Sequence, residues 1–102
     1  MSDNAMGFIE TIGYATAIVA SDYALKAANV KLLRLETVIG VGKMLGVTAF
    51  FSGDVAAVQS AIEAGKRQAM IIGTVVSAHV IPNMDIHARL CMLGKDSNYS
   101  KI

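Results

Sequence analysis

The second half of the chain repeats the residue pattern of the first half. Each half reads as a strand, a helix and a second strand, with identical or similar residues at one constant offset. The matched pairs are Gly13 with Gly53, Ala17 with Ala57, Ile18 with Val58, Ala24 with Ala64 and Lys26 with Lys66. Two copies of a β-α-β unit predict an α+β, ferredoxin-like split βαβ fold, with helices on one face of an antiparallel four-stranded sheet. The other sheet face then needs cover, which a partner subunit can supply.

Hydrophobic periodicity places the elements along the chain. Strands are expected at residues 5–11, 30–38, 47–51 and 74–81, and helices at 14–29 and 54–70. In the first helix, Ile18, Val19 and Leu25 form the apolar stripe, and Asn29 is the expected end. Asp54 is expected at the start of the second helix, as its N-cap or as an anion in its first turn. A short helix is expected at 84–93, so that one domain spans 5–93 and a polar tail spans 94–102.

The composition indicates subunit interfaces. Of the 102 residues, 54% are hydrophobic and 17% are charged. A chain of this length buries only about two-thirds of the surface that its unfolded form exposes. The surplus of apolar side chains therefore favours contacts with other subunits.

Charge and cysteine content exclude several classes of function. The net charge is +1 without a basic cluster, so the electrostatic footprint of nucleic-acid binding is missing. Cys91 is the single cysteine, which rules out an internal disulfide and favours a reducing compartment. The polar N-terminus lacks the basic start of a signal peptide, and no apolar run reaches the ~18 residues of a membrane span. We expect a soluble, cytoplasmic protein that binds neither nucleic acid nor membrane.

No residues combine into a catalytic or metal site. His79 is expected in the last strand, where a structural role is favoured over a catalytic one. His87 falls on a solvated face of the expected third helix, and Cys91 is expected to be a buried, inert thiol. One cysteine and scattered carboxylates give poor support for a metal. We therefore predict no catalytic residue, no metal and no cofactor, and hence no enzyme.

An apolar, glycine-rich stretch at Ile39–Gly46 joins the second and third strands. Its glycines allow positive φ angles or the close approach of another surface. Because solvent-facing loops are normally polar, its apolar residues should contact the body of the protein, a ligand or another subunit. The spacing of Gly40, Gly42 and Gly46 is GxGxxxG, and the loop joins two strands instead of opening a helix. Nucleotide binding is thus disfavoured relative to a simple hairpin.

Four motifs in order resemble those of bacterial microcompartment shell proteins. The chain opens with G-F-I-E-T-x-G from Gly7 to Gly13, similar to the family's G-x-I-E-T-x-G. Asp22 followed by L-K-A-A-N-V resembles its D-x-x-x-K-A-A-x-V helix end. G-D-V-A-A-V from Gly53 resembles its G-D-V-x-A-V turn, and A-H-V-I-P, which ends at Pro82, resembles its last strand. The resemblance runs from Met6 to about Leu90.

The resemblance implies assembly. Single-domain members of the family form flat cyclic hexamers, which tile edge to edge into the facets of a shell around metabolic enzymes. The loop between the second and third strands lines a central pore. The expected partners are therefore a homohexamer, other shell proteins, encapsulated enzymes and metabolites that pass the pore, all at a microcompartment shell in the cytoplasm.

The resemblance also assigns site residues. Taken alone, Lys26 is an exposed helical residue that pairs with Asp22, but it matches the family's edge lysine, which packs across the seam between hexamers. Asn83 stands where many members carry an arginine that supports the same seam, so the strength of tiling is in question. The pore loop is assigned to Gly40, Val41, Gly42, Lys43 and Met44. Within it, Gly40-Val41-Gly42 corresponds to the family's short G-S-G loop, and about four extra residues appear before Thr48.

Two arrangements of the pore stay open. In one, Lys43 places six positive charges near the axis and favours anions. In the other, Lys43 points into bulk water, and Val41 or Met44 makes an apolar constriction. The rival function from another class is a ferredoxin-like sensor whose glycine loop grips a small-molecule effector at a subunit interface.

Overall fold

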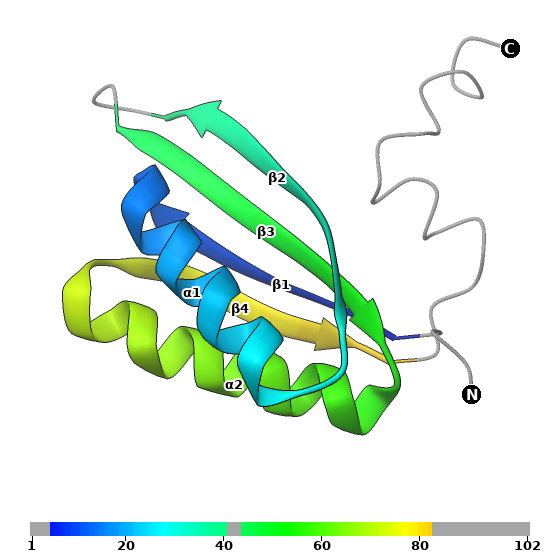
Figure 1. The fold of residues 1–102 in the computed structure, drawn as a ribbon. Coiled ribbons are helices and arrows are strands. Elements are labelled where there is room, and N and C mark those ends of the chain that lie inside the picture. The colour runs from blue at the N-terminus through cyan, green and yellow to red at the C-terminus, as the bar shows by residue number, and fades with distance from the viewer. Residues whose placement is uncertain (1–4, 41–43, 83–102) are drawn as a thin grey trace, which may run out of the picture.

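A single antiparallel sheet carries two helices on one of its faces (Figure 1). The computed structural model describes residues 5–40 and 44–82. In order, the elements are β1 (Ala5–Ile12), α1 (Tyr14–Ala27), β2 (Lys31–Ile39), β3 (Leu45–Gly53), α2 (Val55–Ile72) and β4 (Val75–Ile81). The strand order is β2-β3-β1-β4, which confirms the predicted α+β, ferredoxin-like sheet. The expected helix at 84–93 and the tail at 94–102 lie outside the described residues.

The two repeated halves are related in space as well as in sequence. The first strands of the halves, β1 and β3, pair along their whole length at the centre, from Ala5 opposite Gly53 to Ile12 opposite Gly46. The second strands, β2 and β4, take the two outer positions. Each half thus contributes one central strand, one helix and one edge strand, as the repeated pattern predicts.

The helix boundaries differ from the predicted ones. The first helix, α1, ends at Ala27, because Ala28 already has an extended backbone (φ −156°, ψ 164°). The second helix, α2, continues two residues past the predicted end, and the backbone N–H of Gly73 donates to the Ala69 carbonyl at 2.9 Å. Asp54 does occupy the N-cap position, but its side chain makes no capping hydrogen bond.

The opening motif of β1 is explained by local packing. A Cβ atom at Gly7 would lie 2.6 Å from side-chain atoms of Val58 and Ile62, so only glycine lets α2 approach this strand. The buried hydroxyl of Thr11 donates to the carbonyl of Gly13 at 3.2 Å. Gly13 has a φ of 89°, which favours glycine, and there the chain turns from the sheet into α1.

Small helix residues and large sheet residues make the core. The sheet supplies Ile9, Val47 and Phe51, all fully buried, whereas α1 buries chiefly alanines. Ile18 and Leu25 of the predicted apolar stripe do lie on one face of α1, but that face is not the buried one, since the two residues are 52% and 42% exposed. Alanines let α1 lie close to both the sheet and α2, and this close packing turns the larger side chains outward.

Neither helix of the described chain is both long enough and apolar enough to cross a membrane.

Gly65 should be the least replaceable residue of α2. A Cβ atom there would lie 2.6 Å from the Ala20 carbonyl oxygen and 2.8 Å from Cδ1 of Ile9. Gly65→Ala should therefore lower the free energy of unfolding by about 1–3 kcal/mol through overpacking, although alanine is the better helix former. Urea denaturation at matched protein concentration measures this change. Ser60→Ala, at an exposed position of the same helix, serves as the control and should be neutral or slightly stabilising. A Gly65→Ala protein more stable than the parent would contradict the contact.

Candidate assembly surfaces and pore loop

The paired strands of the β2–β3 hairpin are longer, and the loop between them is shorter, than the sequence suggests. The two strands stay paired as far as Ile39 opposite Leu45, and the N–H of Gly40 donates to the Met44 carbonyl at 2.8 Å. Ile39, Leu45 and Gly46, predicted to lie in the loop, are therefore strand residues. The connection itself is 40–44. Val41, Gly42 and Lys43 of the predicted pore loop lie outside the described residues.

The described glycines of this hairpin do not have left-handed backbones. Among the described residues only Gly13 has a positive φ. Among the described residues, a Cβ atom at Gly40 would approach only the Met44 carbonyl, at 3.7 Å, and one at Gly46 would lie 3.4 Å from the Val38 carbonyl. Both are ordinary contacts. The sequence offered two reasons for glycine in this stretch, a positive φ angle or the close approach of another surface. The structure excludes a positive φ angle at Gly40 and Gly46, so the close approach of another surface is the reason that remains.

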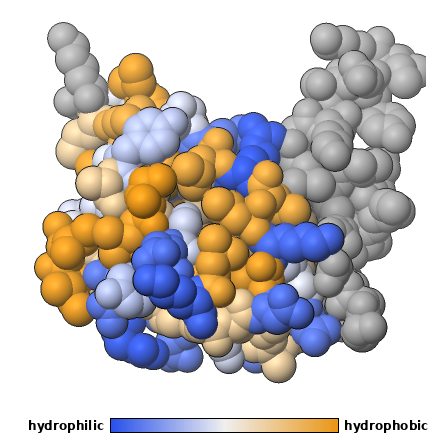
Figure 2. Space-filling view, in the orientation of Figure 1, coloured by the Kyte–Doolittle hydropathy of each residue, from blue (hydrophilic) through white to orange (hydrophobic). Residues whose placement is uncertain are grey.

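Exposed apolar side chains gather at the hairpin end of the protein. The start of α1 and the residue before β4 are bonded to this end, because Gly13 N–H donates to the Leu45 carbonyl and Ile12 N–H to the Thr74 carbonyl. Ile39 at the end of β2 is 74% exposed and Ile71 at the end of α2 is 71% exposed. Figure 2 shows apolar surface over this end. Its exposed large apolar residues are Tyr14, Val38, Ile39, Met44, Met70, Ile71, Ile72 and Val76.

A second apolar surface, here called the β2 flank, lies where α1 leaves β2 uncovered. Tyr14, Ile18 and Leu25 are exposed and fall on one face of α1 by helical spacing. Leu32 and Leu35 of β2 pair with the core residues Phe51 and Ala49, so their side chains point to the helix side of the sheet. Figure 1 shows β2 at the sheet edge, beyond α1. The β2 flank consists of Tyr14, Ile18, Leu25, Leu32, Leu35 and Ile39, of which Tyr14 and Ile39 also belong to the hairpin end and join the two surfaces.

The open face of the sheet has a shallow hollow of about 350 Å³ beside the hairpin. Among its described lining residues the charged one is Glu10, whose Oε1 accepts a hydrogen bond from the Ser77 hydroxyl at 3.2 Å. The other lining residues are Ile12, Val38, Gly40, Met44, Gly46 and Val76. A carboxylate thus lies within an apolar surrounding near the loop that the resemblance assigns to a pore.

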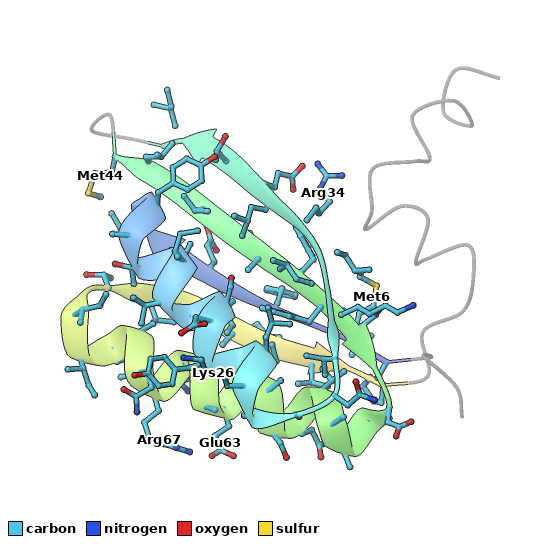
Figure 3. The ribbon with its side chains drawn as sticks, viewed as in Figure 1. Met6, Lys26, Arg34, Met44, Glu63 and Arg67 are labelled. Atoms are coloured by element: carbon cyan, nitrogen blue, oxygen red, sulfur yellow. The ribbon has the colours of Figure 1, made fainter. Side chains whose placement is uncertain are left out.

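Lys26 lies in the last turn of α1, on the outer side of the helix layer (Figure 3). Its Nζ is 2.9 Å from Oδ2 of Asp22 and 5.5 Å from the centre of the Tyr23 ring. The predicted i, i+4 pair is therefore confirmed. The hydrogen bond to Asp22 and the negative charge of that carboxylate raise the pKa of Lys26, which keeps the ammonium charged.

Tyr23 played no part in the sequence interpretation, although a ring three residues before a lysine on a helix is a recognisable signal. Asn83, the other predicted edge residue, lies outside the described residues.

Of the candidate catalytic residues, the structure describes His79 alone. His79 is exposed on the open face of β4, where its ring lies 5.5 Å from that of Phe8. His87 and Cys91 lie outside the described residues. Within 5–40 and 44–82, no three histidine, cysteine or acidic side chains are grouped as metal ligands. What the described residues offer is a set of contact surfaces.

Comparison with known proteins places the chain in a family. The sequence model of the BMC domain matches residues 5–84. The shell protein PduA of Salmonella typhimurium is 44% identical over 82 residues, which are 80% of this chain and 83% of PduA. The shell protein EutM of Escherichia coli is 49% identical over 78 residues, which are 76% of each chain.

A crystal structure of a microcompartment protein from Desulfitobacterium hafniense has the same fold, with a TM-score of 0.68 and 33% sequence identity. It covers 88% of this chain, and this chain spans 47% of the length of that protein.

The chain belongs to the BMC domain family, whose curated members named above are shell proteins of bacterial microcompartments. Its role is structural and not enzymatic, and its place is the microcompartment shell. The family assignment confirms the interpretation made from the four motifs. The rival interpretation, a small-molecule sensor, has no support among these relatives.

Replacing the hairpin glycines should leave the fold of the protomer intact. Gly40→Ala and Gly46→Ala both put a methyl group where the protomer has room. Gly13→Ala is the matched control, and it should cost about 1 kcal/mol or more because its φ of 89° disfavours a side chain. Far-UV circular dichroism and thermal midpoints compare the three variants. A loss of folded signal in Gly46→Ala as large as in Gly13→Ala would show that the glycine serves the protomer itself.

Proposed function

We propose that six copies of this chain form a flat cyclic ring with the β2–β3 hairpins around a central pore, and that rings tile edge to edge into the facets of a microcompartment shell. The carrying observation is the apolar surface that the protomer leaves open, at the hairpin end and along the β2 flank. Exposed patches of this kind mark interaction sites. A ring closes because each copy uses two different surfaces, one toward each neighbour.

The layout of the protomer supports a radial arrangement. The start of α1 is bonded to the hairpin end through Gly13 and Leu45, and Lys26 lies in its last turn. A helix of 14 residues spans roughly 20 Å. In Figure 3, Met44 stands at the hairpin and Lys26 lies well along α1 from it. A hairpin at the axis therefore leaves Lys26 toward the perimeter, where a second ring can meet it.

The partners follow from the family assignment. Other shell proteins of the same compartment meet the ring edges, enzymes lie inside the shell, and small metabolites pass the pore. Asn83 takes the place of a seam arginine in many members, so tiling of this chain alone is weaker than theirs or depends on those partners.

The β2 flank should be essential for the ring. Ile18→Glu puts a charge into a contact that buries Ile18 and should convert the six-subunit species into free protomers. Native mass spectrometry counts the copies in the parent and the variant. Ser60→Glu, at an exposed site of α2, adds the same charge outside both apolar surfaces and should leave the ring intact. A stable dimer or trimer of the parent protein would refute the ring, and an unchanged ring in Ile18→Glu would remove the flank from the interface.

The pore is lined by 40–44, and its charge should determine which metabolites pass. Six Lys43 ammonium groups near the axis favour anions, whereas an apolar constriction made by Val41 or Met44 selects by size and polarity. We adopt the charged pore as the hypothesis to test and keep the apolar constriction as the alternative.

Lys43→Glu should slow the entry of an anionic metabolite and leave ring formation unchanged, because repulsion replaces attraction along the axis. The measurement is the turnover of that metabolite by an enzyme sealed in reconstituted shells, relative to the free enzyme. Arg67→Glu makes the same charge change on α2, away from the hairpin, and should have no effect. Equal turnover in shells of Lys43→Glu and of the parent would favour the apolar constriction.

A further inference from the structure

The charge of Lys26 is already matched within its own protomer. Its ammonium lies 2.9 Å from the Asp22 carboxylate, with both side chains more than half exposed, and 5.5 Å from the Tyr23 ring centre. All three residues lie on α1, within its last two turns. The lysine side chain therefore lies back along the helix, in the direction in which helical Cα–Cβ bonds tilt.

Symmetry decides what Lys26 meets at a seam. When rings of six identical copies tile one plane edge to edge, adjacent rings are related by a two-fold axis, so each edge faces a copy of itself. A lysine on that edge is brought toward the same lysine of the next ring. Two free ammonium groups would repel each other, most strongly at low ionic strength, where screening is weak.

We propose that Asp22 and Tyr23 are positioning residues that hold the Lys26 ammonium against its own protomer, so that the edge presents the alkyl chain of lysine to an identical edge of a second ring. This inference rests on the ring and tiling proposed above. The four methylene groups of lysine cover apolar surface well when the charged end is satisfied elsewhere. Asp22 removes the repulsion between facing lysines, and the Tyr23 ring keeps the chain flat on the helix.

The decisive variant is Asp22→Asn, which keeps the shape and removes the charge. Rings should persist by native mass spectrometry. Sheets in negative-stain microscopy should need more salt, with the threshold moving from about 10 mM toward 0.1 M NaCl as screening replaces the carboxylate. The second virial coefficient of the rings, from static light scattering, reports ring–ring attraction even where no sheets form, and should become more repulsive at low salt.

Glu36→Gln is the matched control. Glu36 is also a partly exposed carboxylate in an ion pair, 3.1 Å from Arg34, but it lies on β2. Both variants raise the net charge of a ring equally, so any difference between them reflects position. Tyr23→Phe should behave as the parent, whereas Tyr23→Leu should shift the salt threshold in the same direction as Asp22→Asn, by a smaller amount. Lys26→Ala is the reference for a lost edge contact, and salt should not restore its sheet formation.

Two results overturn the inference by itself. One is an Asp22→Asn protein with the salt threshold and virial coefficient of Glu36→Gln. The other is a loss of sheets in Asp22→Asn that salt does not restore, because the carboxylate would then act by something other than neutralising the lysine. Parent rings that neither form sheets nor attract one another would instead refute the proposed tiling, and the inference with it. A parent protein that forms no ring would refute the proposed function at its first step.

Discussion

The close contact between the two helices is the constraint on which the rest of the protein depends. At their crossing the Ala20 carbonyl and Gly65 leave no room for a Cβ atom, and Gly73 is packed as tightly against Thr16. Such contacts require alanine and glycine on the facing sides of the helices. The same sides of the helices also cover the core. The helices therefore bury small residues there, and the large buried side chains come mainly from the sheet.

This packing leaves the protomer incomplete. Large apolar residues such as Ile18 and Ile71 have no place inside and remain on the surface. Burying one such side chain fully is worth about 1.5–3 kcal/mol, so a few of them amount to a substantial share of the stability of a small domain. The same feature that makes a thin two-layer protomer thus makes association with other copies favourable, and a shell protein needs both.

The two ends of the protomer serve different purposes in the proposed assembly. At the hairpin end, apolar side chains and the Glu10 carboxylate line a hollow together with Gly40 and Met44, beside the loop where passage would be controlled. Farther along α1, a lysine with a matched carboxylate offers a lateral contact without excess charge. A single helix connects the two functions, because α1 begins beside Leu45 and ends just after Lys26.

The sequence by itself determined the repeated β-α-β unit, the antiparallel sheet, the family and the pairing of Asp22 with Lys26, because these depend on local periodicity, ordered motifs and helical spacing. Only the tertiary structure decided which face of α1 is buried. The sequence interpretation grouped Ile18 and Leu25 on one apolar stripe. The structure leaves that stripe exposed, because the helix crossing at Gly65 admits only small residues. The length of the hairpin was likewise decided by pairing between β2 and β3, since an apolar, glycine-rich stretch is compatible with both loop and strand until a partner strand binds its backbone.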